Sequence, residues 1–385
     1  MRGDVDVTTY DTRPQRVLSG PGARRLVADE IGRLGARRVM LIAAEAEVEM
    51  AREVVAGLDV VATFTAVRPH VPVEAAHAAR EMARTAGADA LLSVGGGSTT
   101  GTAKAVALTE HLPILAVPTT YAGSEATDVW GLTEAGRKTN GTDPAVLPRT
   151  VVYDPELTVS LPTRLTVSSG LNALAHCVDS LWAPQAGPAS TAFAVEGARL
   201  LTMGLSAVQA DGADLEARTR CQDGTYLAAS AFAAAGSGLH HKICHVLGGA
   251  YDLEHAAMHA VLLPHVVGFN APAAPEAADR LAGALQGAGF GPDGGTNGLS
   301  DVADPEHDAA ANALATLQAL YACLGAPTSL GDLGLRAEQL PEAARLALEK
   351  VPPSNPRPVR EQDLADLLGR AQAGTRAVVV PLTSR

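Results

Sequence analysis

Residues 88–108, ADALLSVGGGSTTGTAKAVAL, combine an apolar run, three consecutive glycines and an alanine-rich segment. The pattern predicts a buried strand over 88–97 that leads into a helix beginning near Thr100. Glycine has no Cβ, so the triplet lets a ligand approach the backbone, and the amides that open a helix bind anions. A dinucleotide pyrophosphate fits this turn. The residues expected to contact it are Gly95, Gly96, Gly97, Ser98 and Thr99.

The glycines do not follow the GxGxxG spacing of the usual dinucleotide fingerprint. A plain tight turn with a small-residue cap is therefore the alternative interpretation. The position of the triplet favours the binding interpretation, because it follows a parallel strand, and ligands of open α/β sheets bind at the carboxyl ends of the strands.

Short apolar runs and longer amphipathic segments alternate on both sides of this stretch. Strands are predicted over 37–44, 60–67 and 114–120 and at the start of 151–162, and helices over 46–58 and 73–87. This order is typical of a doubly wound parallel sheet with helices on both faces. Beyond residue 165 the pattern is Ala/Leu-rich and helical. We expect an α/β dinucleotide-binding domain, 1–160, and an all-α catalytic domain, 161–385.

Composition excludes several other classes of protein. The chain has 385 residues and a net charge of −12, without a basic block, which argues against nucleic-acid binding. No apolar run reaches the roughly 18 residues of a membrane helix, and the N-terminus has no signal-peptide pattern. The four cysteines form no CxxC pair, so we expect reduced thiols and a cytoplasmic location.

A second hydroxyl-rich loop, PTTYAGSEAT at 118–127, follows the next strand of the predicted sheet. Thr119, Thr120 and Ser124 are expected to face the cofactor or the substrate, although Ser124 is also a good helix N-cap. Glu45 follows the strand 37–44 and is a candidate for the adenosine ribose hydroxyls. A carboxylate there repels a 2′-phosphate and favours NADH over NADPH. The alternative for Glu45 is a solvated acid at a helix start.

Residues 238–259, GLHHKICHVLGGAYDLEHAAMH, hold five of the eleven histidines. His241 and His245 are four residues apart, on one helix face, and we expect Gly248 and Gly249 to end that helix. His255 follows in a new helix. Upstream, Asn172 and His176 share a face of another helix. The four residues that these helices can bring together are Asn172, His176, His241 and His255.

Three imidazoles and one oxygen ligand suit zinc or ferrous iron. The histidines can also pack or transfer protons, and the residues alone leave these roles open. His240 and His259 are expected to be surface or packing residues. Asn172 is a neutral ligand and binds a divalent ion more weakly than a carboxylate does, so the metal could be weak or missing.

Several ordered segments resemble the iron-containing alcohol dehydrogenase superfamily, and more closely its maleylacetate reductase branch. They are PQRVLSGPGA (14–23), GGGSTTGTAKA (95–105), PTTYAGSEATDVWGLTE (118–134), VLPRTVVYDPELT (146–158), SGLNALAHCVD (169–179), GLHHKICHVLGG (238–249) and NPRPV (355–359). The resemblance implies a fold of the dehydroquinate synthase type, in which an α/β domain precedes a helical domain and the active site lies between them. It places the superfamily's metal ligands at Asn172, His176, His241 and His255. Asparagine replaces the usual aspartate, as it does in the reductase branch.

The resemblance also implies an activity: reduction of maleylacetate, or a related conjugated keto acid, to 3-oxoadipate in the breakdown of aromatic compounds. NADH is the expected hydride donor, and NADPH is possible. A protonated histidine or a bound cation would stabilise the enolate, with His241, His245 or His255 as candidates. Lys242 and Tyr121 are expected to contact the substrate, and Arg137 and Lys138 are further cations. A homodimer is the default assembly.

Three rival functions remain at this point. A metal-dependent alcohol dehydrogenase would reduce a small carbonyl, and Asn172 argues against it. A lyase like dehydroquinate synthase shares the architecture but not the histidine spacing or the segment PTTYAGSE. A nucleotide-binding protein that has lost catalysis is the third alternative.

Overall fold

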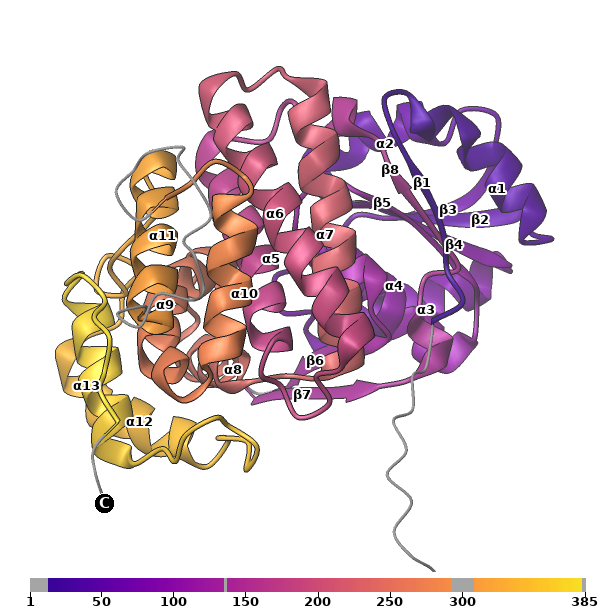
Figure 1. The fold of residues 1–385 in the computed structure, drawn as a ribbon. Coiled ribbons are helices and arrows are strands. Elements are labelled where there is room, and N and C mark those ends of the chain that lie inside the picture. The colour runs from indigo at the N-terminus through magenta and orange to yellow at the C-terminus, as the bar shows by residue number, and fades with distance from the viewer. Residues whose placement is uncertain (1–12, 135–136, 292–307, 383–385) are drawn as a thin grey trace, which may run out of the picture.

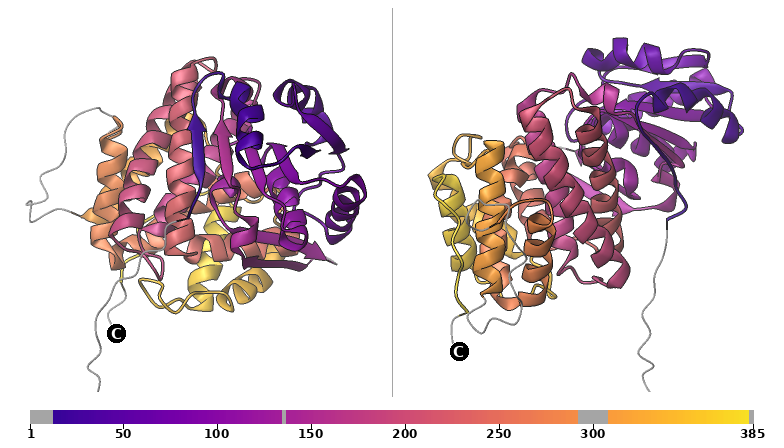
Figure 2. Two further views of the ribbon diagram at one scale, coloured as in Figure 1. Left: turned by 90° about the vertical axis from the view of Figure 1, so that its right-hand side faces the viewer. Right: turned by 45° about the horizontal axis from the view of Figure 1, so that its top comes forward.

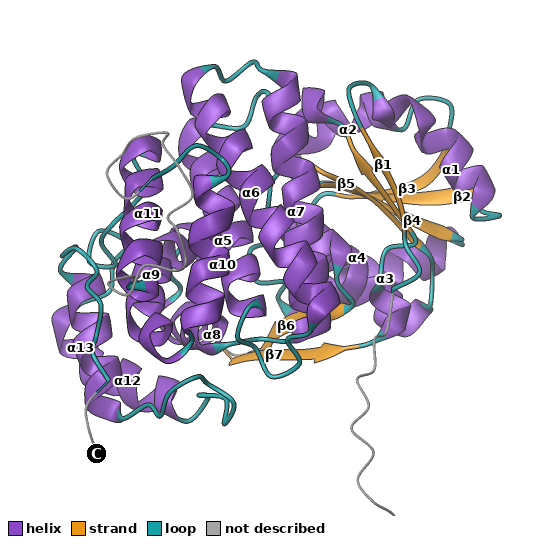
Figure 3. Ribbon diagram, in the orientation of Figure 1, coloured by secondary structure: helices purple, strands orange, loops and turns teal. Residues whose placement is uncertain are grey.

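The computed structural model describes residues 13–134, 137–291 and 308–382. The N-terminal part is a sheet with helices on both faces, and the C-terminal part is a body of packed helices (Figures 1 and 3). The predicted fold class is therefore confirmed. The last strand ends at Tyr153 and the first helix of the helical part begins at Thr163, on either side of the expected boundary near residue 160.

The main sheet has six parallel strands in the order β1-β8-β5-β4-β2-β3. They are β1 (Arg16–Ser19), β2 (Arg38–Ile42), β3 (Asp59–Phe64), β4 (Ala90–Gly95), β5 (Ile114–Pro118) and β8 (Thr150–Tyr153). In the register of β4 and β5, Gly95 lies opposite Pro118. The glycine turn and the loop that begins at Thr119 therefore leave the same edge of the sheet side by side.

Both faces of the sheet are buried, because successive residues of a strand point to opposite sides. On β2, Val39 and Leu41 belong to a cluster with residues of α1 and α2, while Met40 and Ile42 belong to a cluster with α3 and α4. These helices are α1 (Val27–Arg33), α2 (Val48–Val54), α3 (Val73–Ala86) and α4 (Gly97–Glu110). The continuous apolar run at 39–44 thus indicates a central strand of a covered parallel sheet.

The helical part has a fully buried helix near its centre. From Thr166 to Ser180 every residue of α5 is buried, which is typical of a helix surrounded by others. The helices are α5 (Thr163–Ser180), α6 (Pro188–Ala210), α7 (Leu215–Ala235), α8 (Leu239–Tyr251), α9 (His255–Asn270), α10 (Pro275–Gln286), α11 (Ala309–Leu324), α12 (Leu340–Leu348) and α13 (Glu361–Gln372). The sheet and the helical part meet along one side, where α7 contacts β1 (Figure 2).

Several elements differ from the sequence-based expectations. The residues alone did not indicate β1, or the antiparallel hairpin of β6 (Val129–Glu134) and β7 (Arg137–Thr142). Helix α4 begins at Gly97 rather than near Thr100. Short 3-10 segments occur at Ala23–Leu26 (η1), Glu45–Glu47 (η2), Ser124–Ala126 (η3), Pro144–Val146 (η4), Pro155–Thr158 (η5), Ala271–Ala273 (η6) and Ala337–Gln339 (η7).

Gly248 and Gly249 do not end their helix, which was the expectation. Helix α8 continues through both and stops at Asp252, which has a φ of 50°. Glycine inside a helix costs about 1 kcal/mol relative to alanine. The buried side chains of Ile243 and Leu247 offset that cost by packing against α9, α12 and α13. Within the described residues, no helix combines the length and apolar character needed to cross a lipid bilayer.

Candidate active site

The glycine turn packs closely against the second loop, because its glycines have no Cβ atoms. A Cβ built on Gly96 would lie 3.1 Å from Thr120 Cγ2, and one on Gly97 would lie 3.2 Å from Ala122 Cβ. Ser98 is half-buried on the first turn of α4, and no side chain caps this helix. The N-terminus of α4 therefore lies where the two loops meet, next to the side chains of Thr120 and Ala122. We call this space the phosphate cradle (residues 95–99 with Thr119 and Thr120), because it fits the pyrophosphate of a dinucleotide.

Glu47, which sequence reasoning missed, reaches into the phosphate cradle. Its carboxylate accepts hydrogen bonds from the Thr119 hydroxyl at 2.9 Å and the Thr99 hydroxyl at 3.4 Å. Burial raises the pKa of Glu47, and these hydrogen bonds oppose the shift. Glu45, the predicted ribose ligand, is exposed at the start of the same short 3-10 helix. The geometry of this short helix directs Glu47 rather than Glu45 toward the phosphate cradle. That geometry cannot be predicted from the sequence.

A buried lysine holds the second loop in place. The Lys104 ammonium donates hydrogen bonds to the carbonyl oxygens of Ser124 at 2.6 Å, Thr127 at 2.8 Å and Val129 at 2.8 Å. Burial lowers its pKa to about 7, opposed by the charges of Glu125 and Asp128. Ser124 therefore contributes its carbonyl to the scaffold. The alternative interpretation of Ser124 as an N-cap is wrong, because Gly123 takes that position with a φ of 80°.

An imidazole pair occupies the helical side. His176 on α5 and His241 on α8 stack with their ring centroids 4.7 Å apart, and the Phe232 ring of α7 packs against both. Asp179, one turn after His176, places Oδ2 2.8 Å from His241 Nδ1. Sequence reasoning missed Asp179, although its i, i+3 spacing from His176 puts the two on one face of α5.

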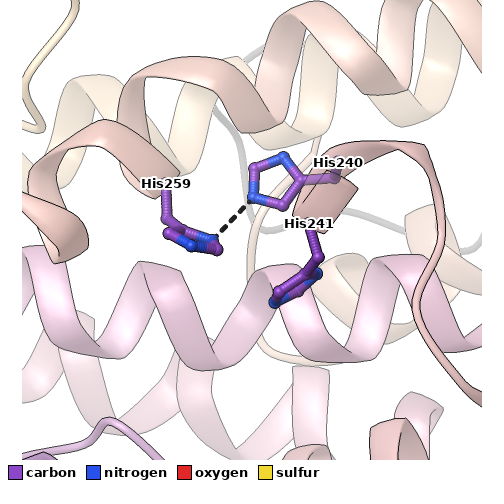
Figure 4. Close-up of side chains that lie close together, drawn as sticks. All are labelled: His240, His241 and His259. Carbon is purple, nitrogen blue, oxygen red and sulfur yellow. Dashed lines mark hydrogen bonds between the residues drawn. The ribbon is translucent and has the colours of Figure 1, made fainter. Parts of the chain in front are cut away.

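His240 and His259 belong to the same cluster, so they are not surface residues, and the expectation of a packing role agrees with their burial. Both are fully buried, and His240 Nε2 lies 3.0 Å from His259 Nδ1 (Figure 4). The ligand atoms of His240, His241 and His259 lie within 4.8 Å of one another, close enough for one metal ion. The two residues lie in adjacent helices, α8 and α9, and this packing brings them together.

The other predicted site residues lie around this core. Asn172 is 2% exposed on α5. His255 is half-buried at the start of α9, with its ring 4.4 Å from that of His259 and 6.5 Å from that of His70. His245 is half-buried, with its ring 6.3 Å from that of His241. The predicted metal ligands therefore lie close to two further histidines, His240 and His259.

The chemistry of these donors fits a divalent ion. Asn172 Oδ1, His176 Nδ1 and His241 Nε2 are buried and have no hydrogen-bond partner among the described residues, and the same is true of one ring nitrogen each of His240 and His259. Buried polar atoms without partners are rare, and they are typical of a site that binds an ion, water or substrate. Imidazole and amide donors suit zinc or ferrous iron.

Burial keeps the central imidazoles neutral. It lowers the pKa of His240 to about 3, and it lowers the pKa values of His176, His241 and His259 well below the usual range, with neighbouring histidines adding to the effect. Protonated His241, one of the electrophiles expected from the sequence, is therefore not supported. A neutral imidazole still offers one N–H donor and one acceptor nitrogen.

The second loop connects the phosphate cradle to the imidazole cluster. The second loop carries Thr119 and Thr120 at its start and Gly123 three residues later. A Cβ on Gly123 would lie 3.5 Å from His176 Nδ1 and 2.9 Å from Ala229 Cβ, so only glycine fits there. From the other side, His70, in the loop after β3, lies next to His255. The two halves therefore meet at the imidazoles.

The structure places the two predicted substrate contacts, Tyr121 and Lys242, in different surroundings. Tyr121 is fully buried, and its hydroxyl bonds to Thr158 and Arg218 at 3.3 Å each. Its side chain thus packs in the core, and the substrate role is not supported. Lys242 is half-buried and forms no ion pair with any residue the structure describes, while its charge helps lower the pKa of His241. The side chains of Arg137 and Lys138 lie outside the described part.

Comparison with known proteins assigns both halves to one class of enzyme. Residues 14–155 match the family model for iron-containing alcohol dehydrogenase, and residues 166–372 match the C-terminal model of the same family. The two models cover the sheet part and the helical part, which together define a two-domain oxidoreductase of the alcohol dehydrogenase type. The chain belongs to the iron-containing alcohol dehydrogenase family, and within it to the maleylacetate reductase branch.

Individual relatives agree with this assignment. A maleylacetate reductase of Sphingobium indicum is 42% identical over 95% of this chain and 97% of its own length. An iron-containing alcohol dehydrogenase of Corynebacterium glutamicum has a structure with a TM-score of 0.87 and 47% identity, covering 96% of this chain and 98% of its own. The maleylacetate reductase structure from Agrobacterium tumefaciens has a TM-score of 0.85 and 38% identity, covering 97% and 100%.

Proposed function

We propose that this oxidoreductase transfers a hydride from NADH to the conjugated alkene of maleylacetate and forms 3-oxoadipate. The observation that carries the proposal is the contact between Gly123 and His176, which joins the phosphate cradle to the imidazole cluster. A dinucleotide whose pyrophosphate lies at the cradle would direct its nicotinamide along this loop toward the histidines. The relatives named maleylacetate reductase supply the substrate.

NADH is the preferred donor in this proposal. The edge of the sheet that carries the phosphate cradle also carries two carboxylates, Glu45 and Glu47, just after β2. Of the two, the exposed Glu45 carboxylate would accept the ribose hydroxyls and repel the 2′-phosphate of NADPH. No cation from the described residues pairs with either one. The prediction about Glu45 from the sequence therefore stands as part of the proposal.

The reaction has two parts that this chain must support. Hydride adds to the alkene carbon β to the ketone, and negative charge develops on the ketone oxygen as an enolate. Hydrogen-bond donors aimed at that oxygen lower the barrier. The neutral imidazole of His176 is the donor nearest the second loop, whereas the Nδ1–H of His241 donates to Asp179 and leaves its Nε2 as an acceptor. A proton is then added at the carbon α to the ketone, which completes the product.

The proton donor must be able to recover its proton from water. His245 and His255 are half-buried, whereas His176, His241 and His259 are buried. Access to solvent therefore favours His245 or His255 for proton delivery. The Asp179 carboxylate orients His241 and acts as a positioning residue.

A metal ion would be held by Asn172, His176, His241 and His255, with His259 next to them. When bound, such an ion polarises a ketone oxygen as a Lewis acid. The neutral Asn172 weakens this set compared with an aspartate, so we propose that the His176 imidazole N–H stabilises the enolate itself. Lys242, with its free ammonium near His241, would pair with one substrate carboxylate.

The experiment that tests the proposal determines which substrate carbon receives the hydride. NADH carrying deuterium at the nicotinamide C4 is mixed with maleylacetate, and the product is examined by proton NMR, with and without a chelator. Deuterium at the former alkene carbon β to the ketone supports the proposal. Deuterium on a carbinol carbon, or turnover of simple aldehydes alone, would instead identify an alcohol dehydrogenase.

A further inference from the structure

The Glu47 carboxylate occupies the place where a dinucleotide phosphate would bind. A Cβ added to Gly95 would overlap Glu47 Oε2, so the carboxylate lies directly on the glycine turn. Gly95 has a φ of 150°, a conformation that side chains rarely adopt, and glycine alone permits this close approach. The carboxylate is thus pressed against the backbone at the first glycine of the triplet.

The groups that bind Glu47 are those expected to bind phosphate. The hydroxyls of Thr119 and Thr99 donate to Oε1 and Oε2 of the Glu47 carboxylate. Gly96 is the N-cap of α4, where the helix dipole favours an anion. A carboxylate and a pyrophosphate make the same kind of hydrogen bonds and carry the same sign of charge. The two anions cannot share one set of donors.

We propose that Glu47 is a built-in competitor of the dinucleotide phosphates, occupying the cradle in the nucleotide-free enzyme and leaving it when the cofactor binds. This inference rests on the proposed function, in which a dinucleotide binds at the glycine turn. The carboxylate satisfies the donors of Thr99 and Thr119 while no nucleotide is present, and its displacement lowers the affinity for the cofactor. Such a residue favours cofactor release after hydride transfer.

The proposal predicts a specific pattern of affinities. Removing the Glu47 carboxylate should tighten binding of ADP-ribose and NADH about tenfold, the effect expected for a charge-assisted hydrogen bond of ordinary strength. Adenosine has no phosphate and should bind Glu47 variants and the wild-type enzyme equally. If Glu47 instead bound the ribose, the result would be the opposite: its replacement would weaken the binding of both adenosine and ADP-ribose.

The experiment is isothermal titration calorimetry of the whole chain with ADP-ribose, NADH and adenosine. The variants are Glu47→Gln, which keeps the shape and removes the charge, and Glu47→Ala, which empties the cradle. Glu53→Gln is the matched control, because Glu53 is an exposed glutamate on the neighbouring helix α2, and the cradle hydroxyls of Thr99 and Thr119 donate to Glu47 instead. Thermal melting of each variant checks that the fold is intact.

The outcomes separate this inference from the proposed function. Tighter ADP-ribose binding by both Glu47 variants, with unchanged adenosine affinity and an unchanged Glu53→Gln variant, supports the competitor role. Unchanged or weaker ADP-ribose binding by folded Glu47→Gln overturns it. If the wild-type enzyme binds neither NADH nor ADP-ribose, the proposed function itself is wrong.

Discussion

Asp179 Oδ2 lies 2.8 Å from His241 Nδ1 and also accepts the backbone N–H groups of His241 at 3.1 Å and Gly238 at 3.2 Å. One fully buried oxygen thus fixes both the imidazole ring and the start of α8. With Nδ1 bound to the carboxylate, Nε2 is the ring atom left for a substrate or an ion. Pairs of this kind set the tautomer and orientation of histidines in many sites.

Replacing Asp179 by Asn should reduce kcat without unfolding the protein. The amide has similar size, but it is neutral and holds the imidazole N–H less strongly, so His241 can adopt the other tautomer. We expect kcat for maleylacetate to fall about 10- to 100-fold. Steady-state kinetics of NADH consumption measures it. The exposed Asp366→Asn is the control, and an Asp179→Asn enzyme with wild-type kcat would exclude a positioning role.

Lys242→Met should raise the KM for a dicarboxylate substrate. The half-buried ammonium near His241 has no ion-pair partner in the part of the chain that is described, so it is available to a carboxylate. We expect a rise in KM of about tenfold or more for maleylacetate, because hydrogen bonds to charged groups contribute about 1.5–3 kcal/mol. An aldehyde without carboxylates should keep its KM. An unaltered KM for maleylacetate removes Lys242 from the site.

Asn172→Asp should increase the affinity for zinc or ferrous iron. The substitution adds a negative charge at a buried oxygen that has no hydrogen-bond partner and lies on the same helix as His176. We expect the purified variant to retain more metal than the wild-type protein after dialysis, as measured by elemental mass spectrometry. Asn140→Asp, on an exposed position of β7, is the control. Equal metal content in all three proteins would show that this position is not a ligand.

Lys104→Met should destabilise the protein strongly. The ammonium satisfies one buried and two partly buried carbonyl oxygens, those of Thr127, Ser124 and Val129, and each loses its partner when the amine is removed. An unsatisfied buried acceptor costs about 1–3 kcal/mol, so we expect the free energy of unfolding to fall by about 3 kcal/mol or more. Urea unfolding measures the change. Lys350→Met, at an exposed position, should stay within about 0.5 kcal/mol of the wild type.

The affinity for ADP-ribose should rise as the pH falls. Burial raises the pKa of Glu47, so this carboxyl group takes up a proton at a higher pH than an exposed glutamate does. The protonated form no longer repels phosphate. The groups that oppose the shift are Thr119, Thr99 and the amides near Ala44 and Gly96, and none of them titrates. Calorimetry from about pH 8 to about pH 5 should show tightening in the wild type and a flatter profile in Glu47→Gln.

Much of the fold followed from local patterns. The strands and helices between residues 37 and 120 were predicted because both signals are local: apolar runs of strand length, and helical periodicity that ends on glycine. The hairpin β6–β7 was missed because its strands include polar and glycine residues, such as Gly131 and Asn140, and no alternating pattern distinguishes them. Helix α8 passed through two glycines because burial in the tertiary structure overrode their low propensity.

The sequence by itself determined the doubly wound sheet, the glycine turn at its edge and the helices that carry Asn172, His176, His241 and His255, because these depend on periodicity and on residues close together in the chain. Only the tertiary structure decided that Glu47 rather than Glu45 enters the phosphate cradle, that Tyr121 is buried, and that His240 and His259 join the cluster. These outcomes depend on how separate elements pack, since a small rotation of a helix or a 3-10 turn moves a side chain from solvent to core.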